Sequence, residues 1–165
     1  MRNIWPEAAE QRCWNHKILN VLDQLPRTQH RAARPMLRAV AYAPSRKEAE
    51  RQRKEFEAWC HRRGYHQAAE TLGRDWDRMV TFYQFPREHW VHLRTVNVVE
   101  SPFAALRLRT DAAKRFKRSD RATAVIWKML MVAERRFRRL NAPHLLAKVY
   151  AGVRYVDGVE ASQEV

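Results

Sequence analysis

The sequence predicts a mainly α-helical protein with at most one short strand. In several segments, apolar residues recur at the i, i+3, i+4, i+7 spacing of a buried helix face. Prolines and a capping box separate these segments. The 165 residues are 45% hydrophobic and 30% charged, with only four glycines and seven prolines. This composition suits one globular domain with a core and leaves little room for linkers.

A short strand and a helix are expected near the N-terminus. Residues 10–14 could form the strand. The helix after it ends at Leu25-Pro26, because a proline disfavours the helical conformation of the residue before it. Its predicted buried stripe comprises Ile18, Leu19, Leu22 and Leu25.

Two further helices are expected before Gly64. The first covers residues 28–43, with Pro35 either in its first turn or at a kink. The second opens at Ser45-x-x-Glu48, which has the spacing of a capping box, and ends near Gly64. Its predicted buried side comprises Ala49, Phe56, Trp59 and Cys60.

A helix over residues 67–83 is predicted next, followed by a short helical turn over 89–93. The Phe85-Pro86 step separates the two. The expected buried side of the longer helix comprises Ala69, Leu72, Trp76, Met79, Val80 and Tyr83. Four tryptophans are assigned to the core: Trp5, Trp59, Trp76 and Trp127.

Three helices are predicted in the last third of the chain. The first starts at Asn97 or at Ser101 and ends before a basic loop over residues 111–120. Ser119 opens the second, which should be the longest helix, and the third covers residues 141–153. The expected buried face of the second comprises Ala122, Ile126, Met129, Ala133, Phe137 and Leu140.

The net charge of +14 indicates an anionic partner, because such an imbalance opposes compaction by self-repulsion. DNA is favoured over a membrane surface, since the basic residues are interleaved with aromatic ones across several elements. No apolar run approaches the 18 residues of a membrane span, and the first residues lack a signal-peptide core. Cys13 and Cys60 define no disulfide framework, so a cytoplasmic location is expected.

The best candidate for a phosphate-binding track runs from Arg94 to Arg121, where eight basic residues face three acids. Over residues 45–70 the tally is seven against five with mixed signs, which is typical of a solvated helix face. Trp90 could stack on an unpaired base or belong to the core. The track comprises Arg94, Arg107, Arg109, Lys114, Arg115, Lys117, Arg118 and Arg121.

Glu100 is the one carboxylate between the aromatic segment and the following arginines. It could be the partner of Asn97 in a capping box, or it could bind a divalent cation beside phosphates. The spacing alone favours the cap. Cys13-x-x-His16 has half of a zinc-site pattern, but no second pair of ligands follows at a suitable spacing, so zinc is not favoured.

Three sequence blocks carry a resemblance to a known family. The first, QRCWNHKILNVL, covers residues 11–22; the second, HWVHLRTVNVVESPFAALRLRT, covers 89–110; the third, RRLNAPHL, covers 138–145. In this order they resemble the Mutator-family transposases of bacterial insertion sequences, and together they span nearly the whole chain.

The resemblance implies a ribonuclease-H-like catalytic domain with an Asp-Asp-Glu triad that holds two Mg²⁺ or Mn²⁺ ions. Glu100 falls on the triad's glutamate and would be a metal ligand, and Cys13 and His16 fall on a motif near the active site. None of the six aspartates lies in a strand-like apolar run. The polypeptide alone is therefore expected to be inactive.

The implied fold is an all-α insertion domain over residues 17–94 together with closing helices of the catalytic domain. Residues 1–16 would end the sheet of that incomplete domain, and residues 95–165 would supply its last helices and a basic segment facing DNA. The implied function is that of a C-terminal part of a transposase. It would bind element ends and target DNA, associate with full-length transposase and, in the complete protein, catalyse cleavage and strand transfer.

The alternative is a non-catalytic basic helical module that binds DNA or inhibits a transposase by joining its oligomer. The missing aspartates favour this alternative for the isolated chain.

Overall fold

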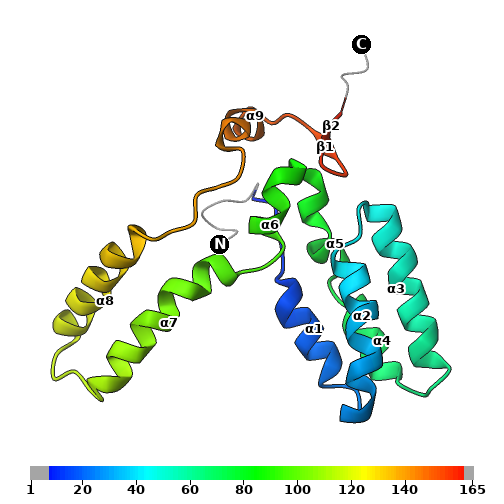
Figure 1. The fold of residues 1–165 in the computed structure, drawn as a ribbon, viewed down its shortest axis with the longest axis horizontal. Helices are drawn as coiled ribbons and strands as arrows, with labels where there is room; N and C mark the ends of the chain where they lie inside the picture. The colour runs from blue at the N-terminus through cyan, green and yellow to red at the C-terminus, as the bar shows by residue number, and fades with distance from the viewer. Residues whose placement is uncertain (1–7, 162–165) are drawn as a thin grey trace. The chain divides into compact units, whose positions relative to one another are not determined.

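The computed structural model describes residues 8–161, and nearly all of their regular structure is helical (Figure 1). The chain divides into two compact units. One comprises Met1–Thr95 together with Asn141–Val165, and the other comprises Val96–Leu140. None of the described helices has the length and apolar character that crossing a membrane requires. The predicted domain boundaries, which rest on the roles of segments in a catalytic fold, stay a prediction.

The first unit is built from short helices that pack around one core. Helix α2 packs against α3 and α1, and α4 packs against α3 and α1 (Figure 1). The helices before the second unit are α1 (Trp14–Leu22), η1 (Arg27–Gln29), α2 (His30–Ala41), α3 (Arg46–His61), α4 (His66–Gly73), α5 (Trp76–Met79), η2 (Thr81–Gln84), η3 (Arg87–His89) and α6 (Trp90–Leu93). After the second unit come η4 (Pro143–Leu145), α9 (Leu146–Tyr150), β1 (Tyr155–Val156) and β2 (Val159–Glu160).

Residues 8–13 contain no strand, so the predicted strand over 10–14 is wrong. The backbone N–H of Arg12 donates to the carbonyl oxygen of Arg78 at 2.8 Å, and that of Trp14 donates to Arg94 at 3.0 Å. The indole Nε1 of Trp14 donates to the carbonyl oxygen of Met79 at 2.9 Å. This segment is therefore held by hydrogen bonds to two separate segments instead of by a sheet.

The buried side of α1 differs from the predicted stripe. Leu22 is buried as predicted, but Leu19 is 50% exposed and Lys17 lies in the interior. The Lys17 Nζ donates to the carbonyl oxygens of Thr71 at 2.9 Å and Arg74 at 2.7 Å. Both carbonyls lie at the C-terminal end of α4, where the carbonyl oxygens of a helix have no hydrogen-bond donor within the helix itself. Burial lowers the pKa of Lys17, and the two carbonyls compensate part of the cost of burying its charge.

Helix α2 is preceded by a 3₁₀ turn, so Pro35 is the sixth residue of the helix and not in its first turn. The position is exposed, and the hydrogen bond that proline cannot donate is lost on the solvent side. Helix α3 confirms its prediction: the Ser45 Oγ accepts from the Glu48 N–H at 3.2 Å. Gly64 follows the end of α3 at φ +77°, a conformation that suits glycine.

The predicted helix over residues 67–83 is divided into α4, α5 and η2. The division occurs at Asp75, whose φ is +59°. Its carboxylate forms ion pairs with Arg12 and Arg78, which fix the left-handed conformation from two sides. The predicted buried residues of this stretch are nonetheless in the core, except that Trp76 is only half-buried.

A β-hairpin near the C-terminus was not predicted, and the last helix, α9, ends at Tyr150 instead of near residue 153. Strands β1 and β2 are antiparallel and joined by Asp157 and Gly158, whose φ values are +50° and +81°. The hairpin packs on the helices: the Arg46 N–H donates to the Asp157 Oδ1 at 2.6 Å, and the Arg87 N–H donates to the Gly158 carbonyl at 3.2 Å. Asp157 thus supplies a hydrogen bond at the N-terminus of α3.

Replacing Gly158 with alanine should destabilise the first unit. A Cβ at this position would lie 2.7 Å from the Arg87 Cβ and 2.8 Å from the Trp90 Cζ2. We expect a loss of about 2–4 kcal/mol in the free energy of unfolding, from the left-handed conformation together with overpacking. Gly152→Ala is the matched control, because its φ is +78° but no atom lies within 4 Å of the new Cβ. It should cost only about 1–2 kcal/mol. Equal losses in urea unfolding would show that the hairpin does not pack against α6.

The second unit consists of α7 (Asn97–Ala112) and α8 (Ser119–Glu134), which pack side by side (Figure 1). The helices extend further into the predicted loop than expected, leaving only residues 113–118 between them. Helix α8 is 16 residues long, as are α3 and α7, so it is not longer than every other described helix, as was predicted. It ends before Phe137, which is 52% exposed.

The second unit has almost no core of its own. Leu106 of α7 is buried, and no residue of α8 is. Trp127 is 66% exposed, so its assignment to the core is wrong. Two helices can bury only the faces that they turn toward each other, and Trp127 does not lie on the face formed by Ala122, Ile126 and Met129. The fourth predicted core tryptophan, Trp5, lies outside the described residues.

Candidate nucleic-acid interface

Glu100 lies in the first turn of α7 and is half-buried. Its backbone N–H donates to the carbonyl oxygen of Val96 at 2.9 Å. Val96 is the N-cap and Asn97 is already the first helical residue, so the Asn97–Glu100 capping box is wrong. The other explanation, cation binding by this carboxylate, stays a prediction.

Residues three, four and seven positions after Glu100 share its side of α7, because these spacings return to the same helix face. They are Phe103, Ala104 and Arg107, all exposed. Leu108 and Arg109 lie on another side of the helix, where they line a groove. Glu100 therefore has an arginine, Arg107, about two turns further along its own face.

The described residues do not form a metal site by themselves. Among them no group of three or more His, Cys, Asp or Glu side chains is placed to hold an ion. Several aspartates have structural partners instead: Asp75 pairs with Arg12 and Arg78, Asp157 accepts from the Arg46 N–H, and Asp77 pairs with the Arg46 side chain. A divalent ion would need further carboxylates besides Glu100.

Cys13 and His16 belong to the start of α1 in the first unit. Cys13 is the N-cap of α1 and is half-buried. His16 is exposed. Cys60 is buried in the core, and burial raises the pKa of its thiol to about 11. A thiol with that pKa is protonated at neutral pH and is a poor metal ligand.

The histidines of the second sequence block bind backbone groups. The His92 Nε2 accepts from the Asn141 N–H at 3.0 Å, and the His89 ring lies 3.2 Å from the carbonyl oxygen of Ala142. His89 is buried, and Ala142 has a φ of +45°. These contacts fix the chain where it re-enters the first unit after α8.

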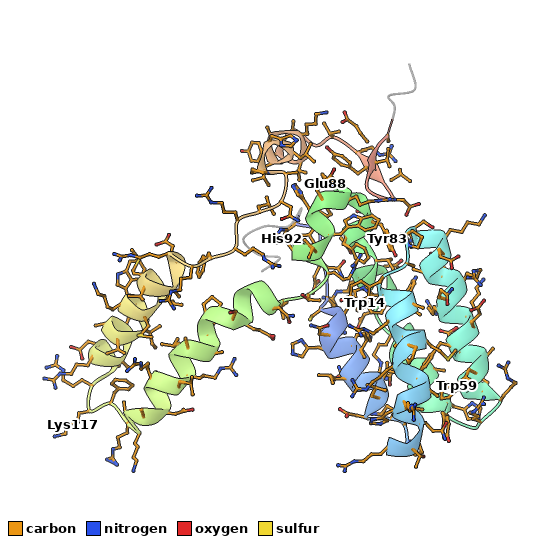
Figure 2. All side chains as sticks on the ribbon, in the orientation of Figure 1. Trp14, Trp59, Tyr83, Glu88, His92 and Lys117 are labelled. Carbon is orange, nitrogen blue, oxygen red and sulfur yellow. The ribbon has the colours of Figure 1, made fainter. Side chains whose placement is uncertain are left out.

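Seven of the eight predicted DNA contacts lie in the second unit. Lys114, Arg115 and Lys117 lie between α7 and α8, and Arg118 is the N-cap of α8; we call these four residues the basic loop. Figure 2 shows Lys117 at this turn, directed away from both helices. The remaining three lie on the adjoining helices: Arg107, Arg109 and Arg121.

All seven of these side chains are exposed. Of these seven, only Arg118 forms an ion pair with another described residue, Asp120 at 2.8 Å. Both partners of that pair are exposed, and such pairs are weak enough to be exchanged for a phosphate. The seven cations are therefore available to a polyanion.

Arg94 and Trp90 have a different environment from the rest of the predicted track. Trp90 is 5% exposed, and its Nε1 donates to the Phe85 carbonyl at 2.9 Å. It belongs to the core and is not free to stack on a base. Arg94 is half-buried, with its guanidinium carbon 4.5 Å from the Tyr42 ring centroid and 4.9 Å from that of Phe82. Burial lowers the pKa of Arg94.

Two features of the surface were not predicted. The first is a groove of about 740 Å³ between α7 and α8, with apolar walls and three arginines at its edge. The groove is lined by Asn97, Ser101, Pro102, Ala105, Leu108, Arg109, Met129, Val132, Ala133, Arg136, Phe137 and Arg138. The second is a set of exposed arginines on η1 and α2. The sequence does show that these arginines have no acidic neighbours along the chain, because no Asp or Glu occurs between residues 24 and 47.

A family model described as "Transposase, Mutator family" matches residues 1–139. The chain is 36% identical, over 158 residues, to the transposase for insertion sequence element IST2 of Acidithiobacillus ferrooxidans. That match covers 96% of the chain and 53% of the relative. The chain is 39% identical, again over 158 residues, to the transposase for insertion sequence element IS6120 of Mycolicibacterium smegmatis. This second match covers 96% of the chain and 49% of the relative.

A third relative, a probable transposase for an insertion sequence element of Corynebacterium diphtheriae, is 31% identical over 126 residues. That match covers 76% of the chain and 37% of the relative. The chain thus spans about half the length of the first two relatives. No solved structure was found to match it.

Proposed function

This chain belongs to the Mutator family of transposases, and on that premise we propose that it binds DNA through the basic loop between α7 and α8. The observation that carries the proposal is the exposure of the seven cations in one small unit together with Glu100. The loop is short, because α7 ends directly before it and α8 begins directly after it. Its cations are therefore held close together. The DNA would be the ends of an insertion element and the target.

In the complete transposase, we propose that Glu100 ligates one of two Mg²⁺ or Mn²⁺ ions used for cleavage and strand transfer. The role of this chain's own residues is to place that carboxylate at the start of α7 and to hold the phosphate backbone nearby. The described residues alone would not cleave DNA, because one carboxylate cannot fix two metal ions. Residues 17–94 are proposed to be the all-α insertion, flanked by segments of the catalytic domain over residues 1–16 and 95–165.

The basic loop should determine how DNA binding depends on salt. Each phosphate that a cation neutralises releases counterions, and this contributes about 0.9 to the slope of log affinity against log salt. Replacing Lys114, Arg115, Lys117 and Arg118 with alanine should reduce that slope by about three units if most of the four contact phosphates. The measurement is a titration of labelled duplex with the purified chain at several salt concentrations.

A matched control for the loop variant removes four cations that already have carboxylate partners: Arg46, Arg51, Arg74 and Lys148. It changes the net charge by the same amount but should alter the slope much less. A loop variant with the slope of the unmodified chain would rule out the basic loop as the phosphate-binding segment.

A second candidate function is a non-catalytic one, in which the chain joins the oligomer of a full-length transposase and inhibits it. The apolar groove between α7 and α8 favours this candidate, because Leu108 is 75% exposed and Val132 48% exposed beside it. The two functions separate in one assay. Purified chain added to an active full-length transposase would suppress transposition at a low molar ratio only if it enters the oligomer.

A further inference from the structure

One face of α2 carries exposed arginines that form no ion pair with any residue that the structure describes. Arg31, Arg34 and Arg38 lie within one narrow sector of the helix, because spacings of three and four residues return to the same side. All three are exposed, whereas Ala33, Leu37 and Val40 on the neighbouring sector are fully buried. Arg27 on the preceding 3₁₀ turn is also exposed and precedes Arg31 by four residues. We call these four residues the arginine stripe.

The stripe differs from the other basic helix of this unit in its lack of ion pairs. On α3, Arg51 pairs with Glu48 and Glu55, and Arg53 pairs with Glu57 at 2.6 Å. None of the stripe arginines forms an ion pair with any residue that the structure describes, and no acidic residue occurs between positions 24 and 47. A solvated helix face usually mixes charges of both signs, as α3 does. The stripe does not.

The stripe continues at the C-terminal end of α2 into an aromatic and cationic contact. Tyr42 follows Arg38 by four residues and is 53% exposed. Arg94 stacks on the Tyr42 ring, with its guanidinium carbon 4.5 Å from the ring centroid. Arg94 was predicted to act together with the cations of α7 and α8, but its position beside Tyr42 adds its charge to the stripe.

We propose that the arginine stripe is a second DNA-binding surface, separate from the basic loop, which holds the phosphate backbone of a duplex. From Arg31 to Tyr42, α2 rises by about 16 Å at 1.5 Å per residue. This length matches the axial rise of about five base pairs of a duplex, at 3.4 Å each. Arginine is suited to the task because its planar guanidinium binds phosphate oxygens in a bidentate manner. The proposal rests on the proposed function, because it takes DNA as the polyanion.

The test compares two triple variants that lose the same charge. One removes three arginines of the stripe: Arg31→Gln, Arg34→Gln and Arg38→Gln. The other removes three exposed cations that are held in ion pairs: Arg51→Gln, Arg74→Gln and Lys148→Gln. Both are titrated with a labelled DNA duplex of arbitrary sequence over a range of salt concentrations, and circular dichroism checks that each retains its helices.

We expect the stripe variant to reduce the slope of log affinity against log salt by about two to three units, because each lost phosphate contact removes about 0.9. The control variant should reduce it by less than about one unit. Equal reductions would mean that only net charge matters and would overturn the proposal. An unchanged slope would overturn it as well, and a loss of self-association in sedimentation at unchanged slope would assign the stripe to a protein contact.

The basic-loop variant, measured in parallel, separates the two proposals. If the loop variant loses slope and the stripe variant does not, the stripe proposal fails and the proposed function stands. If the stripe variant loses slope and the loop variant does not, the stripe is supported and the loop is not the track. If the unmodified chain shows no salt-dependent binding to DNA, both proposals fail.

Discussion

Glu100→Gln in a transposase that carries this region should reduce DNA cleavage by more than about a hundredfold while DNA binding persists. Loss of a residue that only orients a metal ligand already costs about 10–100-fold, so loss of the ligand's charge should cost more. Glutamine keeps the shape of the side chain but removes the negative charge that a divalent ion requires. The measurement is cleavage of an element end by the complete transposase in Mg²⁺.

The variant should fold normally, because the backbone bond from the Glu100 N–H to the Val96 carbonyl does not depend on the side chain. Removing a negative charge from the first turn of a helix costs only about 0.3–1 kcal/mol. Asp111→Asn is the matched control on the same helix, since it removes one exposed carboxylate near the other end of α7. It should leave cleavage intact, and the 165-residue chain alone should cleave nothing.

A Glu100→Gln transposase that cleaves at nearly the normal rate would remove the only catalytic role proposed for this chain. The carboxylate would then be a structural feature of the first turn of α7. A variant that loses DNA binding together with cleavage would point to a folding defect instead, and thermal unfolding of the same preparation would show it.

The helices that could be predicted are those whose boundaries depend on neighbouring residues. Helix α3 begins where Ser45 and Glu48 place it, and its four predicted apolar residues are all buried. One distant residue also contacts its start, because Asp157 accepts a hydrogen bond from the Arg46 N–H. Local propensity and tertiary contact agree there, and the sequence pattern was sufficient.

The features that could not be predicted depend on contacts between distant residues. The division between α4 and α5 at Asp75 requires Arg12, which lies 63 positions earlier. The interior place of Lys17 requires the carbonyls at the end of α4. No period of apolar residues contains this information, because the partner of each polar group is set by the fold.

The C-terminal hairpin is different, because a local signal for it is present. Asp157-Gly158 between Tyr155-Val156 and Val159-Glu160 is a typical two-residue hairpin turn, with a positive φ at both positions. The hairpin could therefore have been predicted, and its contact with the start of α3 could not.

The candidate sites divide in the same way. The cations of the basic loop are exposed, because a loop between two helices has little chance of burial. Their contact with DNA stays a prediction. Arg94 was predicted to belong to the track and Trp90 lies near its start, but they pack with Phe82 and Tyr42. The arginine stripe lies outside the two segments, residues 45–70 and 94–121, whose charge balance supported the sequence predictions. What distinguishes it is the pairing of each charge, which requires a structure.

Trp14→Ala should cost about 3–5 kcal/mol of the free energy of unfolding, the range for truncating a large buried aromatic residue. Trp14 is 1% exposed and packs edge to face against Trp76, with ring centroids 6.0 Å apart. The change also leaves the Met79 carbonyl without the donor that now lies 2.9 Å away. Urea unfolding followed by circular dichroism measures the loss.

Trp14→Phe keeps most of the ring but removes the donor, so it should cost about 1–3 kcal/mol and remain measurable if the alanine variant does not fold. Two controls replace exposed aromatic residues. Tyr150→Ala lies in the same unit at 97% exposure, and Trp127→Ala removes a tryptophan that is 66% exposed in the second unit. Each should change the free energy of unfolding by no more than about 0.5 kcal/mol. A large loss for Trp127→Ala would mean that another surface covers the exposed side of α8 in solution, whereas a small loss for Trp14→Ala would contradict the packing of α1 on α5.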